Sequence, residues 1–239
     1  MNTLLLRFAA PIQSWGADSK FDKRMTSREP TKSGVIGMLA AALGRERDEP
    51  LNDLVELRFG VRIDQPGQFL KDFQTARPAG SKNPFVSMRH YLMDAVFLVG
   101  LEGSEYFLQT LEAAVLAPVF PLYLGRRSCP PVGRISLGIR DKHLERALRE
   151  EPWQASNWYR ERELRRVMSP QLALVMDNPE TGAYRRRDIP LSFSQDHRQY
   201  TYRYISDEAN AVSVRDIYIT AATEHDPFKG GAPSVSVKD

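Results

Sequence analysis

One stretch, residues 28–44 (REPTKSGVIGMLAAALG), constrains the fold of this chain more than any other. Pro30 favours a stiff turn, Thr31 or Ser33 can cap the first free N–H groups of a helix, and Gly44 stands where a left-handed helix stop is expected. The apolar residues between these ends leave no polar face. The stretch therefore predicts a buried core helix with well-marked ends.

The start of this helix is also a candidate binding site. Gly34, Gly37 and Ala41 place small residues along one side, which lets the backbone lie close to a sheet or to RNA. Arg28 and Lys32 flank the helix N-terminus, where the partial positive charge of the helix favours a phosphate. A core helix that carries two solvated charges is the alternative.

The composition is that of a soluble globular protein, with 42% hydrophobic and 26% charged residues. Without an apolar run of about 18 residues or a secretory signal, we expect a cytoplasmic location and no membrane partner. Cys129 is the single cysteine and no Cys/His spacing indicates a metal, so neither a disulfide nor a cofactor is expected. The net charge is only +3, but arginine, which suits phosphate contacts, heavily outnumbers lysine.

Periodicity predicts the main strands. Residues 55–64 alternate apolar and polar, which predicts a strand with one buried face and a polar face that bears Arg58 and Arg62. The unbroken apolar run at 95–101 predicts a central strand covered on both faces. Other patterns predict strands at 3–8, 119–124, 172–176 and 200–205, and helices after Ser104 and at 142–150.

The order of these elements is strand, helix, strand, hairpin, strand, helix, strand. This is the split βαβ order of ferredoxin-like domains, which RNA-recognition domains share. We therefore predict an α+β fold, ferredoxin-like (RNA-recognition-motif-like), with a projecting β-hairpin and a β-rich C-terminal part. Its predicted parts are a domain at 1–124 with the hairpin inserted at about 66–92, an arginine-lined loop and β-rich subdomain at 125–225, and a flexible tail at 226–239.

Two further segments have the residue types of an RNA site. The predicted hairpin interleaves aromatic residues with basic ones, among them Lys71, Arg77 and Arg89, which suits an RNA backbone; a solvated insertion is the alternative. The loop at 125–134 (GRRSCPPVGR) sets arginines among prolines and glycines, as either a rigid RNA seat or a stiff surface turn. Trp15 can stack on a base or cover the edge of the sheet.

Three blocks resemble a known family: residues 4–16 (LLLRFAAPIQSWG), 28–44, and 121–131 (PLYLGRRSCPP), with a weaker fourth at 89–101. They are similar to the CasD family of type I-E CRISPR Cascade subunits, within the repeat-associated RNA-binding superfamily. The resemblance implies a non-catalytic subunit that caps the 5′ handle of a CRISPR RNA and helps assemble the antiviral complex. Its hairpin would be a thumb that grips RNA.

The implied partners are the CRISPR RNA and other Cascade subunits, including the backbone and large subunits. Target DNA would be contacted only indirectly, and no small-molecule substrate is expected. The candidate RNA contacts are Trp15, Arg28, Lys32, Ser33, Gly34, Lys71, Arg77, Arg89, Tyr91, Arg126 and Arg127.

Two other functions stay open. One is a metal-independent endoribonuclease that processes repeat RNA, for which His90, Tyr91 and Lys71 form a candidate cleavage set because such a reaction needs a base, an acid and a cation near the phosphate. The other is a scaffold that contacts only proteins.

Overall fold

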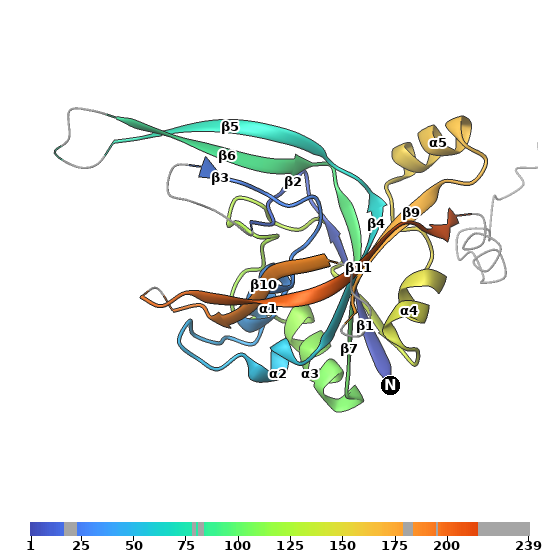
Figure 1. Cartoon of the computed structure of the whole chain (residues 1–239), viewed down its shortest axis with the longest axis horizontal. Helices are drawn as coiled ribbons and strands as arrows, with labels where there is room; N and C mark the ends of the chain where they lie inside the picture. Colours follow the sequence, from blue (N-terminus) through green and yellow to red (C-terminus); the bar gives the residue numbers. More distant parts are fainter. Residues whose placement is uncertain (17–22, 78–79, 81–83, 179–183, 195, 215–239) are drawn as a thin grey trace, which may run out of the picture.

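The computed structural model describes residues 1–16, 23–77, 80, 84–178, 184–194 and 196–214. Its main element is a seven-stranded sheet with the strand order β10-β11-β9-β4-β7-β1-β8, in which all neighbours are antiparallel (Figure 1). The strands are β1 (Asn2–Ala9), β4 (Arg58–Gln65), β7 (Val96–Gly103), β8 (Ser136–Arg140), β9 (Gln171–Asp177), β10 (Tyr184–Ser192) and β11 (Gln199–Ser213).

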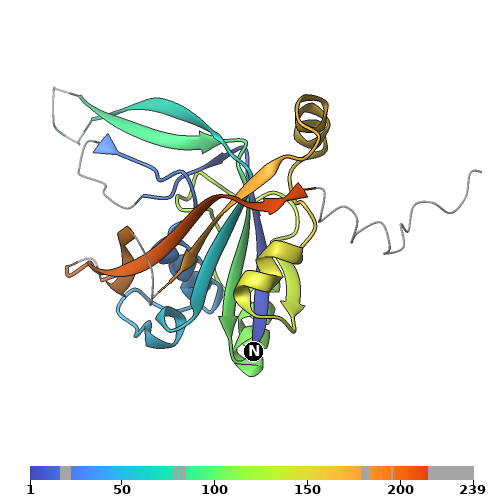
Figure 2. The same cartoon turned by 45° about the vertical axis from the view of Figure 1, so that its right-hand side comes forward.

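A smaller sheet stands beside the main one. Its long arm is the antiparallel pair β5 and β6, which extends away from the main sheet in both views (Figures 1 and 2). Two short strands pair with the base and the middle of β6. The members are β2 (Ile12–Gln13), β3 (Lys23–Arg24), β5 (Gln68–Ala76) and β6 (Phe85–Met93). The segment predicted as a hairpin is therefore a pair of strands, and part of its expected tip lies outside the described residues.

Helices cover both faces of the main sheet (Figure 2). Alternate residues of a strand point to opposite faces, so Leu4 and Leu6 pack in the core beneath α1 and α3, whereas Leu5 packs against α4. Because β7 is buried on both sides, its apolar run is unbroken, as the sequence predicts. The helices are α1 (Lys32–Ala42), α2 (Asn52–Val55), α3 (Glu105–Leu116), α4 (Leu144–Glu150) and α5 (Asn157–Arg166). Within the described residues, none of them is both long and apolar enough to cross a membrane.

The predicted core helix is confirmed as α1, including both of its ends. The Thr31 hydroxyl accepts a hydrogen bond from the Gly34 N–H at 3.3 Å, and Gly44 has a φ of +77° just beyond the last turn. A positive φ is strained for residues with a Cβ, which explains the glycine at this stop.

The strand predicted at 119–124 is wrong. Pro118 and Pro121 lack backbone donors, and the segment follows the end of α1 instead, where the Val119 and Phe120 N–H groups donate to the carbonyls of Ala42 and Ala41 at 3.0 and 3.2 Å. The bond to Ala42 satisfies a carbonyl that the helix end leaves free, whereas the Ala41 carbonyl also accepts from the Gly44 N–H at 3.1 Å. The strand that pairs with the outer side of β1 is β8.

The structure also corrects one expectation about β4. Arg62, predicted on an exposed polar face, has a fully buried side chain that forms an ion pair with Asp64. On its other side β4 pairs with β9, so strands of the predicted β-rich C-terminal part continue the main sheet. The predicted tail at 226–239 lies outside the described residues.

Candidate nucleic-acid interface

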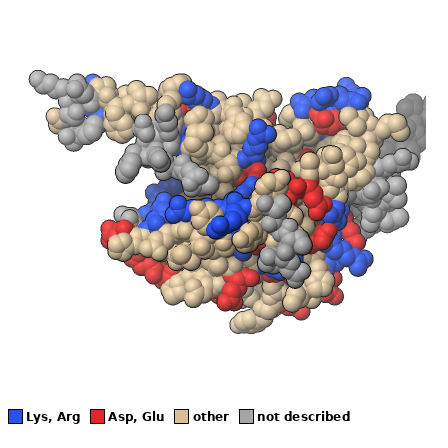
Figure 3. All heavy atoms as spheres, viewed as in Figure 1, with Lys and Arg blue, Asp and Glu red and all other residues tan. Residues whose placement is uncertain are grey.

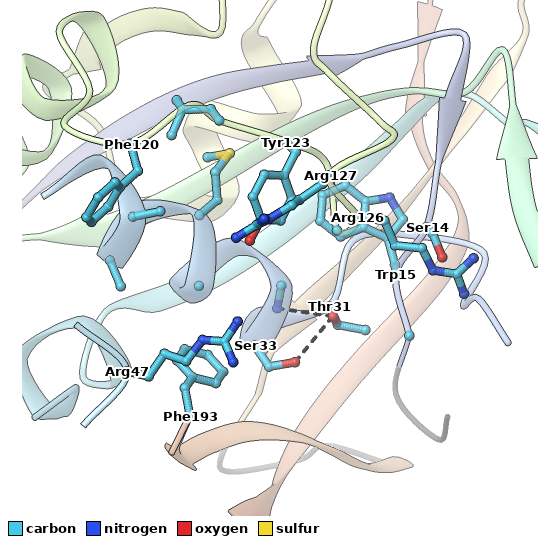
Figure 4. Close-up of a pocket in the computed structure, with 18 of the residues that line it drawn as sticks. Ser14, Trp15, Thr31, Ser33, Arg47, Phe120, Tyr123, Arg126, Arg127 and Phe193 are labelled. Carbon is cyan, nitrogen blue, oxygen red and sulfur yellow. Dashed lines mark hydrogen bonds between the residues drawn. The ribbon is translucent and has the colours of Figure 1, made fainter. Parts of the chain in front are cut away.

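Lysine and arginine side chains are unevenly spread over the surface (Figure 3). One concentration lines a groove of about 1300 Å³ beside α1. Figure 4 shows Arg47 and Phe193 on one side of this opening and Arg126, Arg127 and Tyr123 on the other. We call it the arginine groove because, among its described lining residues, Glu46 is the sole acid against the arginines Arg24, Arg45, Arg47, Arg126, Arg127 and Arg198.

The floor of the arginine groove is the side of α1 that carries small residues, as the sequence predicts. A Cβ at Gly37 would lie 3.5 Å from the Phe193 ring, which is ordinary contact. At Gly34, by contrast, a Cβ would lie 2.9 Å from Trp15 Cε3. Gly34 therefore serves the packing of α1 on Trp15.

Trp15 lies in the core. Of the two roles considered for it, stacking on a base or covering the edge of the sheet, the structure favours the second. Its side chain is 1% exposed, its ring stacks on Phe8 with centroids 5.6 Å apart, and its Nε1–H donates to Gln13 Oε1 at 3.1 Å. The prediction that Trp15 stacks on a base is therefore corrected, because its ring is buried against Phe8 and is not accessible to RNA.

The anion site expected at the start of α1 is occupied by the protein itself. Asp188 accepts a hydrogen bond from the Lys32 backbone N–H at 2.9 Å, and the Lys32 ammonium pairs with Asp177 at 3.0 Å. Arg203 bridges both carboxylates at 2.6 and 2.7 Å; burial alone would lower its pKa, but the two aspartates raise it. The charge of Lys32 is thus balanced inside the fold. Arg28 remains exposed, with its guanidinium 5.8 Å from the Phe69 ring centroid.

The loop with Arg126 and Arg127 packs against Ser14, in the segment that follows β1 and β2. Gly125 has a φ of +88°, and a Cβ there would lie 1.6 Å from the Ser14 carbonyl oxygen, so only glycine fits. The Leu124 N–H donates to the Cys129 carbonyl and the Cys129 N–H to the Arg126 carbonyl, both at 2.8 Å. These contacts hold the loop in one tight turn, and its rigidity stays a prediction.

The two arginines of the loop differ. Arg126 donates to the backbone carbonyls of His90 at 3.2 Å and Arg24 at 2.9 Å, and its guanidinium lies 4.7 Å from the Tyr91 ring centroid. It therefore ties the loop to β6 and β3. Arg127 is exposed and has no hydrogen-bond or ionic partner among the described residues.

The hairpin residues predicted to bind RNA are likewise divided. Lys71 and Arg77 are exposed and Arg89 is half-buried. Tyr91 is only 4% exposed. Burial raises its pKa, but Ser128 and Arg126 outweigh that effect and hold the pKa below its usual value. Tyr91 therefore anchors the Arg126 side chain. Aromatic rings do remain on the hairpin surface, at Phe69, Phe73 and Phe85.

The candidate cleavage set is not brought together. Lys71 and His90 are directly opposite in the β5–β6 ladder and so share one face. Tyr91 is the next residue of the same strand and points to the other face, where Arg126 covers it. Within the described residues, no group of three or more His, Cys, Asp or Glu side chains could hold a metal ion.

Sequence reasoning missed several residues of the arginine groove, among them Arg47, Phe193 and Arg198. Arg47 follows α1, whereas Phe193 and Arg198 belong to the connection between β10 and β11. Arg47 and Arg198 have no hydrogen-bond or ionic partner in the part of the chain that the structure describes. No local pattern marks them, because they meet only when β10 packs on α1.

A mostly antiparallel α/β protein with an arginine-lined groove beside a projecting hairpin has the features of a protein that binds a polyanion. Comparison with known proteins identifies the family. The Cascade subunit CasD of the CRISPR system of Escherichia coli (strain K12) is 37% identical over 156 residues, which cover 56% of this chain and 70% of that relative. The chain belongs to the CRISPR-associated protein family Cas5, whose model matches residues 3–205.

Two solved structures agree with this assignment. A chain of a CRISPR RNA-guided surveillance complex is 33% identical and has a TM-score of 0.74, covering 89% of this chain and 92% of that chain. A crystal structure of a Cas protein is 37% identical and has a TM-score of 0.68, covering 87% and 94%.

Proposed function

We propose that this chain is a non-catalytic, CasD-like subunit of a type I-E CRISPR surveillance complex that binds and caps the 5′ handle of the CRISPR RNA. The observation that carries the proposal is the arginine groove. Arg47, Arg127 and Arg198 project their charges into one opening and none is neutralised by a described acid. Unpaired guanidinium groups in a groove attract a phosphate backbone.

The fold supports the same proposal. The order β4-β7-β1-β8, with a helix after β1 and another after β7, is the one that a ferredoxin-like connection produces. We infer that β5 and β6 act as an RNA-gripping thumb, because Lys71 and Arg77 are exposed there beside exposed phenylalanines.

The proposed RNA contacts combine the groove with the hairpin. They are Arg28, Ser33, Arg47, Lys71, Arg77, Arg89, Arg127 and Arg198. Lys32, Gly34, Trp15, Tyr91 and Arg126 support these contacts by holding α1 and the loop in place. The partners would be the CRISPR RNA and neighbouring backbone and large subunits in the cytoplasm, with target DNA read through guide pairing.

The experiment is to purify the tagged chain gently from its host and to sequence the RNA and identify the proteins that accompany it. We expect repeat-derived RNA with a protected 5′ end and other CRISPR subunits. Arg47→Gln with Arg127→Gln should reduce the retained RNA by about tenfold or more and flatten the salt dependence of retention. Arg146→Gln with Arg165→Gln removes the same charge from exposed positions on α4 and α5 and should change neither.

Three results would contradict the proposal. Retention of neighbouring subunits without RNA would favour a protein-only scaffold. Cleavage of repeat RNA in chelator, lost in His90→Ala, would favour an endoribonuclease. Equal loss in the groove pair and the control pair would show that only net charge matters.

A further inference from the structure

A second group of arginines and tyrosines lies outside the arginine groove, on the outer face of β10 and β11. Arg185 is paired in register with Tyr204, and Arg187 with Tyr202. The Arg185 guanidinium lies 4.5 Å from the Tyr202 ring centroid and 5.9 Å from that of Tyr204. We call these four residues the Arg–Tyr ladder.

The ladder is exposed. About half of each tyrosine is accessible, 51% for Tyr202 and 49% for Tyr204, and Arg185 and Arg187 are exposed as well. Figure 3, seen from the side of Figure 1, shows basic atoms gathered over β10 and β11. The four side chains therefore form an accessible surface of the sheet.

On the opposite face of the same two strands, the arginines form ion pairs with acidic residues. Arg186 pairs with Glu29 at 2.5 Å, and Arg203 pairs with Asp188. These alternate residues point toward α1, where acids neutralise them. Arg185 and Arg187 point outward, and within the described residues neither has an acidic partner. The outer face thus keeps its positive charge although the inner face does not.

We propose that the Arg–Tyr ladder binds a segment of single-stranded nucleic acid, separately from the arginine groove. A track of positive charge interleaved with aromatic rings is the arrangement that proteins use for single strands, because guanidinium groups hold phosphates and every base can stack on a ring. Arg185 and Arg187 are two residues apart along a strand, roughly 6.6 Å, which suits successive phosphates of an extended chain. Diagonal stacking on Tyr202 also restrains the Arg185 side chain, so less freedom is lost on binding.

The ladder and the groove are built from different residues of the β10–β11 pair. Phe193, Arg198 and Tyr200 line the groove near the connection between the two strands, whereas the ladder lies farther along both strands. The two sites are adjacent, because Arg187 Nε donates to the Tyr200 carbonyl at 3.5 Å. Because they share no residue, the two sites can be tested independently, and the failure of one does not imply the failure of the other.

The test is fluorescence anisotropy of labelled 12-nucleotide mixed-sequence RNA and DNA with the full chain at several salt concentrations. Arg185→Gln with Arg187→Gln should lower the affinity by about tenfold and reduce the salt slope by roughly 1.4, since each phosphate contact contributes about 0.7 for a single strand. The control pair Arg146→Gln with Arg165→Gln removes equal charge and should leave both quantities unchanged. Equal losses for RNA and DNA indicate a generic strand site, and a loss confined to RNA indicates recognition of the 2′-hydroxyl; either supports the proposal.

A second pair of variants tests the contribution of the tyrosine rings to binding. Tyr202→Thr with Tyr204→Thr keeps residues that suit a strand but removes both rings, and should weaken binding at least about fivefold. Tyr202→Phe with Tyr204→Phe keeps the rings and should bind within about twofold of the wild type. This conservative pair separates lost stacking from a disturbed sheet.

Photo-crosslinking of the same oligonucleotides to the unmodified chain removes any dependence on variant folding. Crosslinked peptides that contain Tyr202 or Tyr204 are expected. Crosslinks confined to groove peptides, together with wild-type affinity in the ladder variants, would overturn this inference and leave the proposed function intact. Ladder variants that keep nucleic-acid affinity but lose a protein from the purified complex would overturn it in favour of a subunit interface.

Discussion

Arg62 and Asp64 form a two-pronged ion pair inside the protein, with Nε–Oδ1 and Nη2–Oδ2 distances of 2.6 and 2.8 Å and no exposed surface on either side chain. They are two residues apart on β4 and so lie on the same face. The remaining Arg62 donors bond the carbonyls of Leu148, Glu151 and Pro152, which join α4 and the segment after it to the sheet.

Breaking this pair should therefore be costly. Asp64→Ala leaves a buried guanidinium without its counter-ion and should lower the free energy of unfolding by about 3–5 kcal/mol. Arg62→Met with Asp64→Leu removes both charges and should cost less than the single change. Urea denaturation followed by circular dichroism measures both values. Equal costs would show that the pair matters only through its volume.

Two glycines of α1 should respond oppositely to alanine. Gly34→Ala places a methyl group 2.9 Å from Trp15 Cε3, and the ring cannot retreat because it stacks on Phe8. We expect a loss of about 1–3 kcal/mol of stability. Gly37→Ala meets only ordinary contact with Phe193 and gains up to about 1 kcal/mol from helix propensity. Thermal melts of the two variants check the difference in sign.

The adjacent loop arginines should separate into a structural and a binding residue. Arg126→Gln loses the contacts to the His90 and Arg24 carbonyls and to the Tyr91 ring, so both the melting temperature and the RNA affinity should fall. Arg127→Gln should lower RNA affinity several-fold at an unchanged melting temperature, because its side chain has no partner among the described residues. A drop in stability for Arg127→Gln equal to that of Arg126→Gln would contradict this division.

Glu102 should contribute to acid sensitivity. Burial raises the pKa of Glu102, but the Leu144 N–H, Arg58 and His143 together hold it below the usual value. Because the folded pKa is depressed, the stabilisation is complete above roughly 4.3, the pKa of an exposed glutamate, and is lost as the pH falls further. Glu102→Gln should be less stable than the wild type at pH 7, and the gap should narrow below pH 4. The exposed Glu105→Gln is the control, and a gap that is the same at every pH would refute the assignment.

Much of the scaffold could be predicted from local patterns. The caps of α1 depend on Thr31 and Gly44, whose effect is confined to neighbouring backbone groups, and both are confirmed. The two-sided burial of β7 follows from its unbroken apolar run. The tight turn at Gly125 likewise agrees with the glycines and prolines of this loop, because Gly125 has a φ of +88° next to the Ser14 carbonyl. Family membership was also recognisable from short blocks, and the comparisons confirm it.

The burial and the partners of individual charged residues could not be predicted without the tertiary structure. Arg62 and Arg58 occupy equivalent positions in an alternating strand, yet Arg62 is buried against Asp64 and Arg58 is half-exposed. Lys32 was expected to face a phosphate, but Asp177 and Asp188, which are 145 and 156 residues away, bind its side chain and its backbone N–H.

Local sequence patterns predict both ends of α1 and the buried strands β1 and β7, because caps, turns and hydrophobic periods act over a few neighbouring residues. The tertiary structure determines which arginines are neutralised, as Arg62 is, and which have no partner among the described residues, as is the case for Arg47 and Arg198. These two line one groove from segments far apart in the chain. The physical reason is that the solvation and pairing of a charge depend on whatever folding places within a few ångströms of it, and in this protein those groups come from distant segments.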